Sequence, residues 1–195
     1  MLELLGDIDR TMFLFFNVTI SNPVTNILMP IVTSDNLLRV LYGVAMILLL
    51  WKGDSRLRWL VLFSAFALLV ADQLSSQFLK PLIARPRPCH IMTDINLLVN
   101  CGAGYALPSS HATNAFAQAA LFSLAARNTR WYLWAFASIV AVSRVFVGVH
   151  YPFDVFAGAF IGTAVGIAVA FGFGYFEQKR KEGIASSSQS KEKKR

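Results

Sequence analysis

Long apolar stretches separated by short polar turns occupy most of this sequence. Four of them have roughly the 20 residues that an α-helix needs to cross the hydrocarbon core of a bilayer. They are residues 59–79, 109–126, 131–149 and 152–176. A fifth stretch, 36–51, is shorter and includes Arg39. The pattern predicts an all-α polytopic membrane protein whose core is a bundle of five transmembrane helices.

The stretch 11–34 is apolar and uncharged, but three asparagines and two prolines interrupt it. We interpret it as two amphipathic helices that lie in the outer membrane interface. If it spans the membrane instead, the bundle has six helices and the orientation of the rest is unchanged. The chain then divides into interfacial helices at 1–35, a transmembrane core at 36–178 and a basic, disordered tail at 179–195.

The composition supports a membrane environment. Hydrophobic residues make up 55% of the chain and charged residues 15%, whereas a soluble domain carries about 25% charged residues. The mean hydropathy is +0.53. These values exclude a disordered chain and argue against a water-soluble globule.

Basic residues are unevenly distributed along the chain. The turns at 52–58 and 127–130 and the tail at 179–195 hold twelve of the eighteen lysines and arginines. By the positive-inside rule these segments are cytoplasmic, so the longer loop at 81–108 faces outward. The net charge of +7 lies mostly in the tail. It therefore indicates membrane orientation, and we expect no nucleic-acid partner.

The outward loop contains both cysteines of the chain, Cys89 and Cys101. On that side of the membrane they meet an oxidising compartment, in which disulfides persist. The sequence leaves open whether the two cysteines form a bridge or remain free thiols, because it does not give their Cβ geometry.

Four basic residues, Lys80, Arg85, Arg87 and Arg144, lie at the level of the outward loop. A charge at the edge of a bilayer is energetically costly and needs a reason. Contact with lipid headgroups explains a single arginine near a helix end. It does not explain why histidines and an aspartate gather at the same level.

Two of the three histidines lie beside predicted helix starts. Pro152 favours the first turn of a helix, which puts Asp154 within reach of His150. A carboxylate that binds one imidazole nitrogen leaves the other nitrogen as a nucleophile or base. His111 follows Ser109 at another helix N-terminus, where unpaired N–H groups can bind phosphate. Taken singly, each feature is better explained by helix capping.

Together these residues indicate one kind of chemistry. Three cations and a helix N-terminus can surround an oxyanion, and two histidines can supply a nucleophile and an acid. That equipment suits phosphoryl transfer without a metal ion. The residues are Lys80, Arg87, Ser109, His111, Arg144, His150 and Asp154.

Three motifs in fixed order carry a family resemblance. The first is K-x6-R-P from Lys80 to Pro88, the second is PSSH at 108–111, and the third is S-R-x5-H-x3-D from Ser143 to Asp154. This set resembles the type 2 phosphatidic acid phosphatase superfamily, membrane lipid phosphatases related to vanadium haloperoxidases and glucose-6-phosphatase. Ser110 replaces the usual glycine of the second motif, which leaves its backbone N–H available to a phosphate.

The resemblance implies a role for each motif residue. His150, oriented by Asp154, attacks phosphorus, and His111 protonates the leaving oxygen and then activates water. The phosphate-binding residues are Lys80, Arg87, Ser109, Ser110 and Arg144. The resemblance implies neither a metal nor another cofactor.

The resemblance also implies a substrate class and a location. We expect a membrane lipid phosphate as substrate, with undecaprenyl diphosphate as the first candidate. Phosphatidate, phosphatidylglycerol phosphate and a lipid A phosphate are alternatives, as are a lipid phosphotransferase and a non-enzymatic lipid-binding protein. The expected location is the cytoplasmic (inner) membrane, with the active site on the outer face and the C-terminus in the cytoplasm.

Overall fold

The computed structural model describes residues 2–125, 128 and 130–192, and every regular element in this part of the chain is a helix. This confirms the predicted all-α fold. In chain order the elements are α1 (Leu2–Leu14), η1 (Phe15–Thr19), α2 (Pro23–Val32), α3 (Asp35–Lys52), α4 (Ser55–Gln73), η2 (Leu74–Leu79), α5 (Lys80–Ile83), α6 (Pro88–Ile91), α7 (Ser110–Ala125), α8 (Arg130–Phe146) and α9 (Pro152–Glu192).

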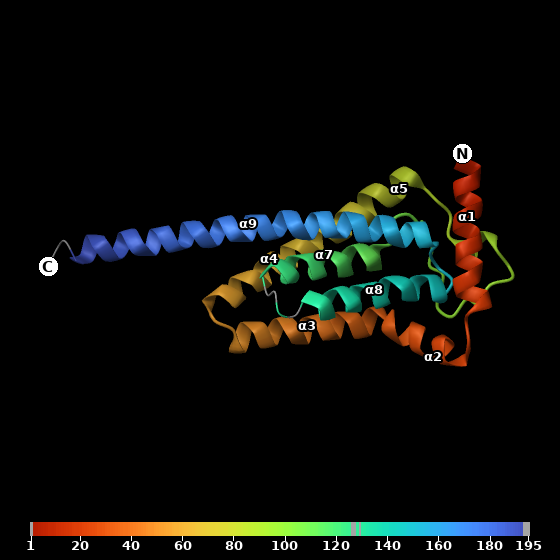
Figure 1. Ribbon diagram of the computed structural model, residues 1–195, viewed down its shortest axis with the longest axis horizontal. Helices are drawn as coiled ribbons and strands as arrows, with labels where there is room; N and C mark the ends of the chain where they lie inside the picture. Colours follow the sequence, from red (N-terminus) through yellow and green to blue (C-terminus); the bar gives the residue numbers. More distant parts are fainter. Residues whose placement is uncertain (1, 126–127, 129, 193–195) are drawn as a thin grey trace.

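Five long helices, α3, α4, α7, α8 and α9, run side by side, and α1 lies across one end of the bundle (Figure 1). They correspond to the five apolar stretches of the sequence. Helix α7 packs against α4, α8 and α9. Its buried residues are mostly alanines, whose small side chains let neighbouring helices approach closely.

Two segments, Ser55–Ile91 and Pro152–Ile184, are long and apolar enough to cross a membrane. Helices α3, α7 and α8 have 18, 16 and 17 residues. At about 1.5 Å per residue they are roughly 24–27 Å long, slightly less than a hydrocarbon core of about 30 Å. The count of five spans stays a prediction.

The N-terminal region is bent. The segments Glu3–Thr19 and Pro23–Val32 meet at 113°. The second segment begins at a capping box, in which the Asn22 side chain accepts from Val24 and Thr25. A bent pair of this kind suits both interfacial helices and a broken span, so the interfacial assignment of 1–35 stays a prediction.

Buried Asn17 in η1 fixes this region to the bundle. Its amide nitrogen donates to the carbonyl oxygen of Phe146 at 2.7 Å, and its side-chain oxygen accepts from the backbone N–H of Asn96 at 2.8 Å. Buried polar groups need such partners. The contact joins η1, the outward loop and the end of α8.

The C-terminal segment differs from the sequence prediction. A disordered tail was expected from residue 179, but α9 continues as a helix to Glu192. Glu182 pairs with Gln178 and Lys179 at helical spacings, which stabilises an exposed helix. Residues 193–195 of the predicted tail, and Arg127 and Thr129 of the predicted turn at 127–130, lie outside the described residues.

A row of glycines allows α9 to touch the backbone of α7. A Cβ atom added at Gly158, Gly162 or Gly166 would lie 2.6, 2.1 or 2.3 Å from a carbonyl oxygen of α7 or of the residue before it. Larger residues would push the helices apart. This contact sets the distance between the N-termini of α7 and α9, where the motif residues lie.

We expect Gly162→Ala to lower the thermal unfolding midpoint of the purified protein in detergent. The new methyl group overlaps the Thr113 carbonyl, and overpacking of this kind costs about 1–3 kcal/mol. Gly174→Ala is the matched control, because a Cβ there meets nothing within 4 Å. Equal midpoints for the two variants would contradict close α7–α9 packing.

Candidate active site

The three motif segments meet at one end of the bundle, where α7 and α9 begin and α8 ends (Figure 1). Lys80 begins α5 and Arg87 directly precedes α6. Arg144 lies in the last turn of α8. His150 lies in the loop between α8 and α9.

His150 is buried, with 1% of its surface exposed. Its Nδ1 atom lies 3.5 Å from Oδ2 of Asp154. The loop reaches this position through Gly148, whose φ of +87° suits glycine, and a Cβ there would lie 2.7 Å from the Asn96 carbonyl oxygen. The other ring nitrogen, Nε2, is therefore the one that can serve as a nucleophile.

The surroundings of His150 favour its neutral form. Burial lowers the pKa of His150 well below its ordinary value, and the charges of Arg144, Lys80 and Arg87 lower it further. A neutral imidazole keeps the lone pair that a nucleophile needs. Three of the predicted cations thus act electrostatically on this histidine.

Asp154 is fully buried and is held by two donors. Arg85 donates to Oδ1 at 2.7 Å, and the backbone N–H of Tyr151 donates to Oδ2 at 2.8 Å. Arg85 also donates to Asp9 at 2.7 Å, and Asp9 accepts from the backbone N–H of Phe153 at 2.9 Å. One guanidinium thus bridges two buried carboxylates, one from α1 and one from α9.

The three motifs do not predict the bridge that Arg85 makes between Asp9 and Asp154. Arg85 has no position in the three motifs, and Asp9 lies in an acidic N-terminal segment that resembles a solvated helix. One feature of the sequence pointed to such a contact: Arg85 lies two residues before Arg87 at the level of the site but has no role in the motifs. Nothing local in the sequence connects it to Asp9.

The motif cations are each anchored by one backbone or hydroxyl acceptor. Lys80 donates to the carbonyl oxygen of Tyr105 at 3.0 Å. Arg144 donates to the hydroxyl of Thr33 at 2.5 Å. The Nε atoms of Arg87 and Arg144 are buried and have no partner among the described residues. These N–H groups can donate to phosphate oxygens.

The loop at 81–108 holds Arg87 in place. Cys89 and Cys101 are joined by a disulfide, with their Cα atoms 6.1 Å apart, and Arg87 donates to the carbonyl oxygen of Cys101. His90 contacts the carbonyl oxygen of Gly102 at 2.9 Å in an exposed position, and it does not join the site.

The N-terminus of α7 adds three predicted residues. The backbone N–H of Ser109 donates to the carbonyl oxygen of Asp154 at 2.9 Å. The Ser109 hydroxyl is buried and has no partner among the residues described. The Ser110 hydroxyl lies 2.9 Å from that of Ser76. The group of Ser110 that is predicted to meet phosphate is its backbone N–H.

His111 contacts the junction of α2 and α3. Its Nε2 atom lies 3.2 Å from the carbonyl oxygen of Thr33 and 3.2 Å from Oδ1 of Asp35. The motifs do not predict these two contacts, because Thr33 and Asp35 precede His111 by more than 70 positions. Their oxygen atoms lie within hydrogen-bond reach of one nitrogen of the ring, so they can hold the imidazole in position.

Among the described residues, one group of side chains lies close enough to hold a metal ion: Cys89, His90 and Cys101. Both of its sulfur atoms belong to the disulfide, so they are not available as thiolate ligands. The cations, by contrast, surround His150 and can neutralise a phosphoryl group.

Comparison with known proteins agrees with this geometry. Residues 58–177 match the model of the PAP2 superfamily. A lipid A 4'-phosphatase of Bacteroides thetaiotaomicron is 35% identical over an alignment of 176 positions that covers 83% of this chain and 75% of the relative. An undecaprenyl-diphosphatase of Sulfolobus acidocaldarius is 31% identical over 121 residues, 62% of this chain and 57% of the relative.

A solved structure shares the fold. The crystal structure of a transmembrane PAP2-type phosphatidylglycerolphosphate phosphatase from Bacillus subtilis aligns with a TM-score of 0.63 and 23% identity, covering 90% of this chain and 87% of that chain. The likeness supports a membrane-embedded helical bundle. Because the family model covers more than half of the sequence, the chain belongs to the PAP2 superfamily.

Proposed function

We propose that this protein is an integral membrane phosphatase that hydrolyses a lipid-linked phosphate or diphosphate through a phosphohistidine intermediate. The observation that carries the proposal is the buried His150, whose Nδ1 atom lies 3.5 Å from Asp154, in surroundings that lower its pKa. Membership in the PAP2 superfamily supports the same reaction class.

In the first step, Nε2 of His150 attacks phosphorus and the bond to the lipid oxygen breaks. His111 donates a proton to that oxygen, so the lipid leaves as an alcohol, or as a lipid phosphate when the substrate is a diphosphate. Asp154 stabilises the positive charge that develops on the imidazole. The product of this step is phosphohistidine at position 150.

In the second step, neutral His111 removes a proton from water as the water oxygen attacks phosphorus. The nitrogen–phosphorus bond then breaks and inorganic phosphate leaves. Throughout both steps, charge on the phosphoryl oxygens is balanced by side chains and by one backbone N–H. These donors are Lys80, Arg87, Arg144, Ser109 and the amide of Ser110. The mechanism uses no metal ion.

Arg85 and Asp9 act in this proposal as positioning residues. Arg85 fixes the Asp154 carboxylate, and Asp154 in turn lies beside His150. Asp9 holds the other end of the guanidinium and the start of α9. Neither residue touches the reacting atoms, so both affect the rate through the orientation of His150.

The share of each chain that the relatives cover supports a choice between lipid A and undecaprenyl diphosphate as the substrate. The Bacteroides relative, named for lipid A 4'-phosphate hydrolysis, matches most of both chains. The undecaprenyl-diphosphatase match covers a smaller share. We therefore place a phosphorylated glycolipid of the lipid A type first and undecaprenyl diphosphate second. This reverses the order expected from the sequence.

The positive-inside pattern supports a sidedness for the site. Twelve of the eighteen basic residues belong to the segments 52–58, 127–130 and 179–195, which the positive-inside rule assigns to the cytoplasm. We place the site on the outer face of the cytoplasmic membrane and the C-terminus in the cytoplasm. A lipid can then reach the site from the bilayer.

His150→Ala is expected to reduce phosphate release from lipid A by a thousandfold or more, as removal of a nucleophile does. Release by the unmutated protein should persist in EDTA, because the cations replace a metal. Release from lipid A, undecaprenyl diphosphate and phosphatidate is measured side by side in detergent. His90→Ala is the matched control, since His90 lies outside the site. Activity that survives in His150→Ala, or that EDTA abolishes, would contradict the mechanism.

Arg85→Gln is expected to lower kcat for lipid phosphate by about 10- to 100-fold while KM changes less than about threefold. The substitution leaves the carboxylates of Asp9 and Asp154 buried without their shared cation, which costs about 3–5 kcal/mol of stability. Adding Asp9→Asn should restore part of the thermal stability, because it removes one of the two charges.

Arg10→Gln is the control for this experiment, because Arg10 is an exposed neighbour of Asp9 on α1. A KM effect without a kcat effect would place Arg85 in substrate binding. That outcome would refute its role as a positioning residue.

A further inference from the structure

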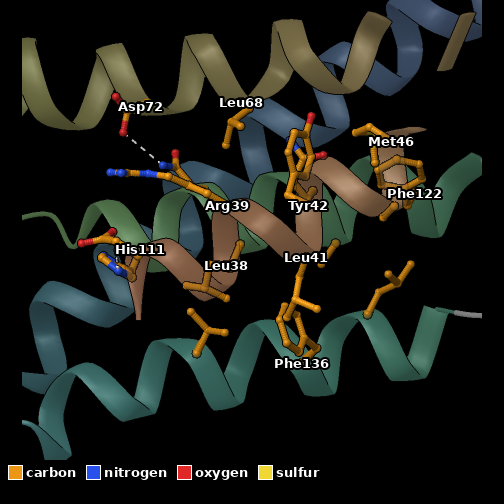
Figure 2. Close-up of a pocket in the computed structure, with 18 of the residues that line it drawn as sticks. Leu38, Arg39, Leu41, Tyr42, Met46, Leu68, Asp72, His111, Phe122 and Phe136 are labelled. Carbon is orange, nitrogen blue, oxygen red and sulfur yellow. Dashed lines mark hydrogen bonds and ion pairs between the residues drawn. The ribbon is translucent and has the colours of Figure 1, made fainter. Parts of the chain in front are cut away.

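A cavity of about 630 Å³ lies between α3, α4, α7 and α8, and His111 is part of its wall. Figure 2 shows His111, Arg39 and Asp72 at one end of the cavity, and Met46 and Phe122 at the other. Most of the lining is apolar. The end of the cavity at His111 is therefore its polar end, where Arg39 and Asp72 also lie.

In the proposed mechanism, this cavity holds the part of the substrate that is attached to the leaving oxygen. His111 protonates the oxygen that leaves phosphorus, while the cations hold the phosphoryl group around His150. The group attached to the leaving oxygen must then lie on the cavity side of His111. This step rests on the proposed function.

The polar end of the cavity presents hydrogen-bond acceptors. Asn114 donates its amide to Oδ1 of Asp72 at 3.0 Å. The Asn114 side-chain oxygen is buried and has no partner among the described residues. A carboxylate accepts further hydrogen bonds as well. Arg39 lies at the same end (Figure 2). An ionisable residue within a membrane bundle needs a functional reason.

These acceptors discriminate among the possible leaving groups. A buried acceptor needs an O–H or N–H donor from its ligand. The diacylglycerol part of phosphatidate offers only ester oxygens. The second phosphate of a polyprenyl diphosphate is an anion, so the carboxylate of Asp72 repels it. A sugar ring that carries hydroxyl and amide groups supplies the donors.

We propose that Asp72, Asn114 and Arg39 form a sugar-binding subsite next to His111, and that it takes the phosphorylated sugar ring of a glycolipid. Hydroxyl or amide groups of the ring donate to Asp72 and Asn114, and Arg39 donates to ring or ester oxygens. An acyl chain of the glycolipid fills the apolar remainder. Leu38, Leu41, Leu68, Phe122 and Phe136 line that part.

The test measures selectivity between two lipids in the same detergent micelles. The readout is the ratio of kcat/KM for lipid A 4'-phosphate to kcat/KM for phosphatidate. Asn114→Leu removes the amide acceptor at nearly constant size, and Asp72→Leu removes the carboxylate acceptors together with their charge. We expect each to lower the ratio by about 10- to 100-fold, because an unpaired donor on the sugar is costly.

Tyr42→Phe is the matched control, because it removes a hydroxyl from the same cavity that is already bound to Ser64 at 2.9 Å. We expect its ratio to stay within about twofold of the unmutated value. Phosphatidylglycerol phosphate, whose glycerol carries one hydroxyl, is a third substrate. A loss confined to that lipid would overturn the assignment to sugar.

Equal losses on both lipids in both variants would show that Asp72 and Asn114 only support packing, and would overturn the subsite alone. An unmutated protein that does not prefer lipid A over phosphatidate would also overturn it. The proposed function is tested separately by phosphate release in His150→Ala. Failure of the unmutated protein to release phosphate from any lipid would overturn both.

Discussion

The buried carboxylate of Asp154 is the point on which the other parts of the site depend. A charge in an apolar bundle is costly unless it is paired and hydrogen-bonded. Here Arg85 and the Tyr151 amide satisfy it, and the backbone oxygen of the same residue accepts from Ser109. The loop after α5, the start of α9 and the start of α7 are thereby fixed to one residue. Nδ1 of His150 lies 3.5 Å from the same carboxylate.

Helix packing provides the frame for that carboxylate. The glycines of α9 bring its backbone against α7, so two helix N-termini lie next to each other. One N-terminus presents backbone N–H groups to an anion, and the other is preceded by His150. The cations then come from segments that end at the same level. Apolar packing thus determines where the polar chemistry occurs, although none of the packing residues reacts.

The sequence predicted the helical bundle and the motif residues for different reasons. Apolar stretches of bilayer length are informative because lipid requires helices with internally bonded backbones. The motif residues were identifiable because their spacing is fixed within short segments. Asp9, Thr33 and Asp35 were not identifiable, because each acts through a contact with a residue far along the chain. Asp9 and Arg85, for example, are separated by 76 positions. The helix beyond residue 178 was missed because its stabilising pairs are weak and local.

The bridge from Asp9 to α9 also has a consequence for biosynthesis. Asp9 accepts from the backbone N–H of Phe153, 144 positions later. A ribosome therefore delivers the first helix long before the group that it must bind exists. Until residue 153 has entered the membrane, Asp9 and Arg85 have only each other, and Asp154 has not been made. The candidate site is then completed late in insertion: a chain truncated before α9 would contain His150 and all three motif cations, but it would lack the Asp154 carboxylate.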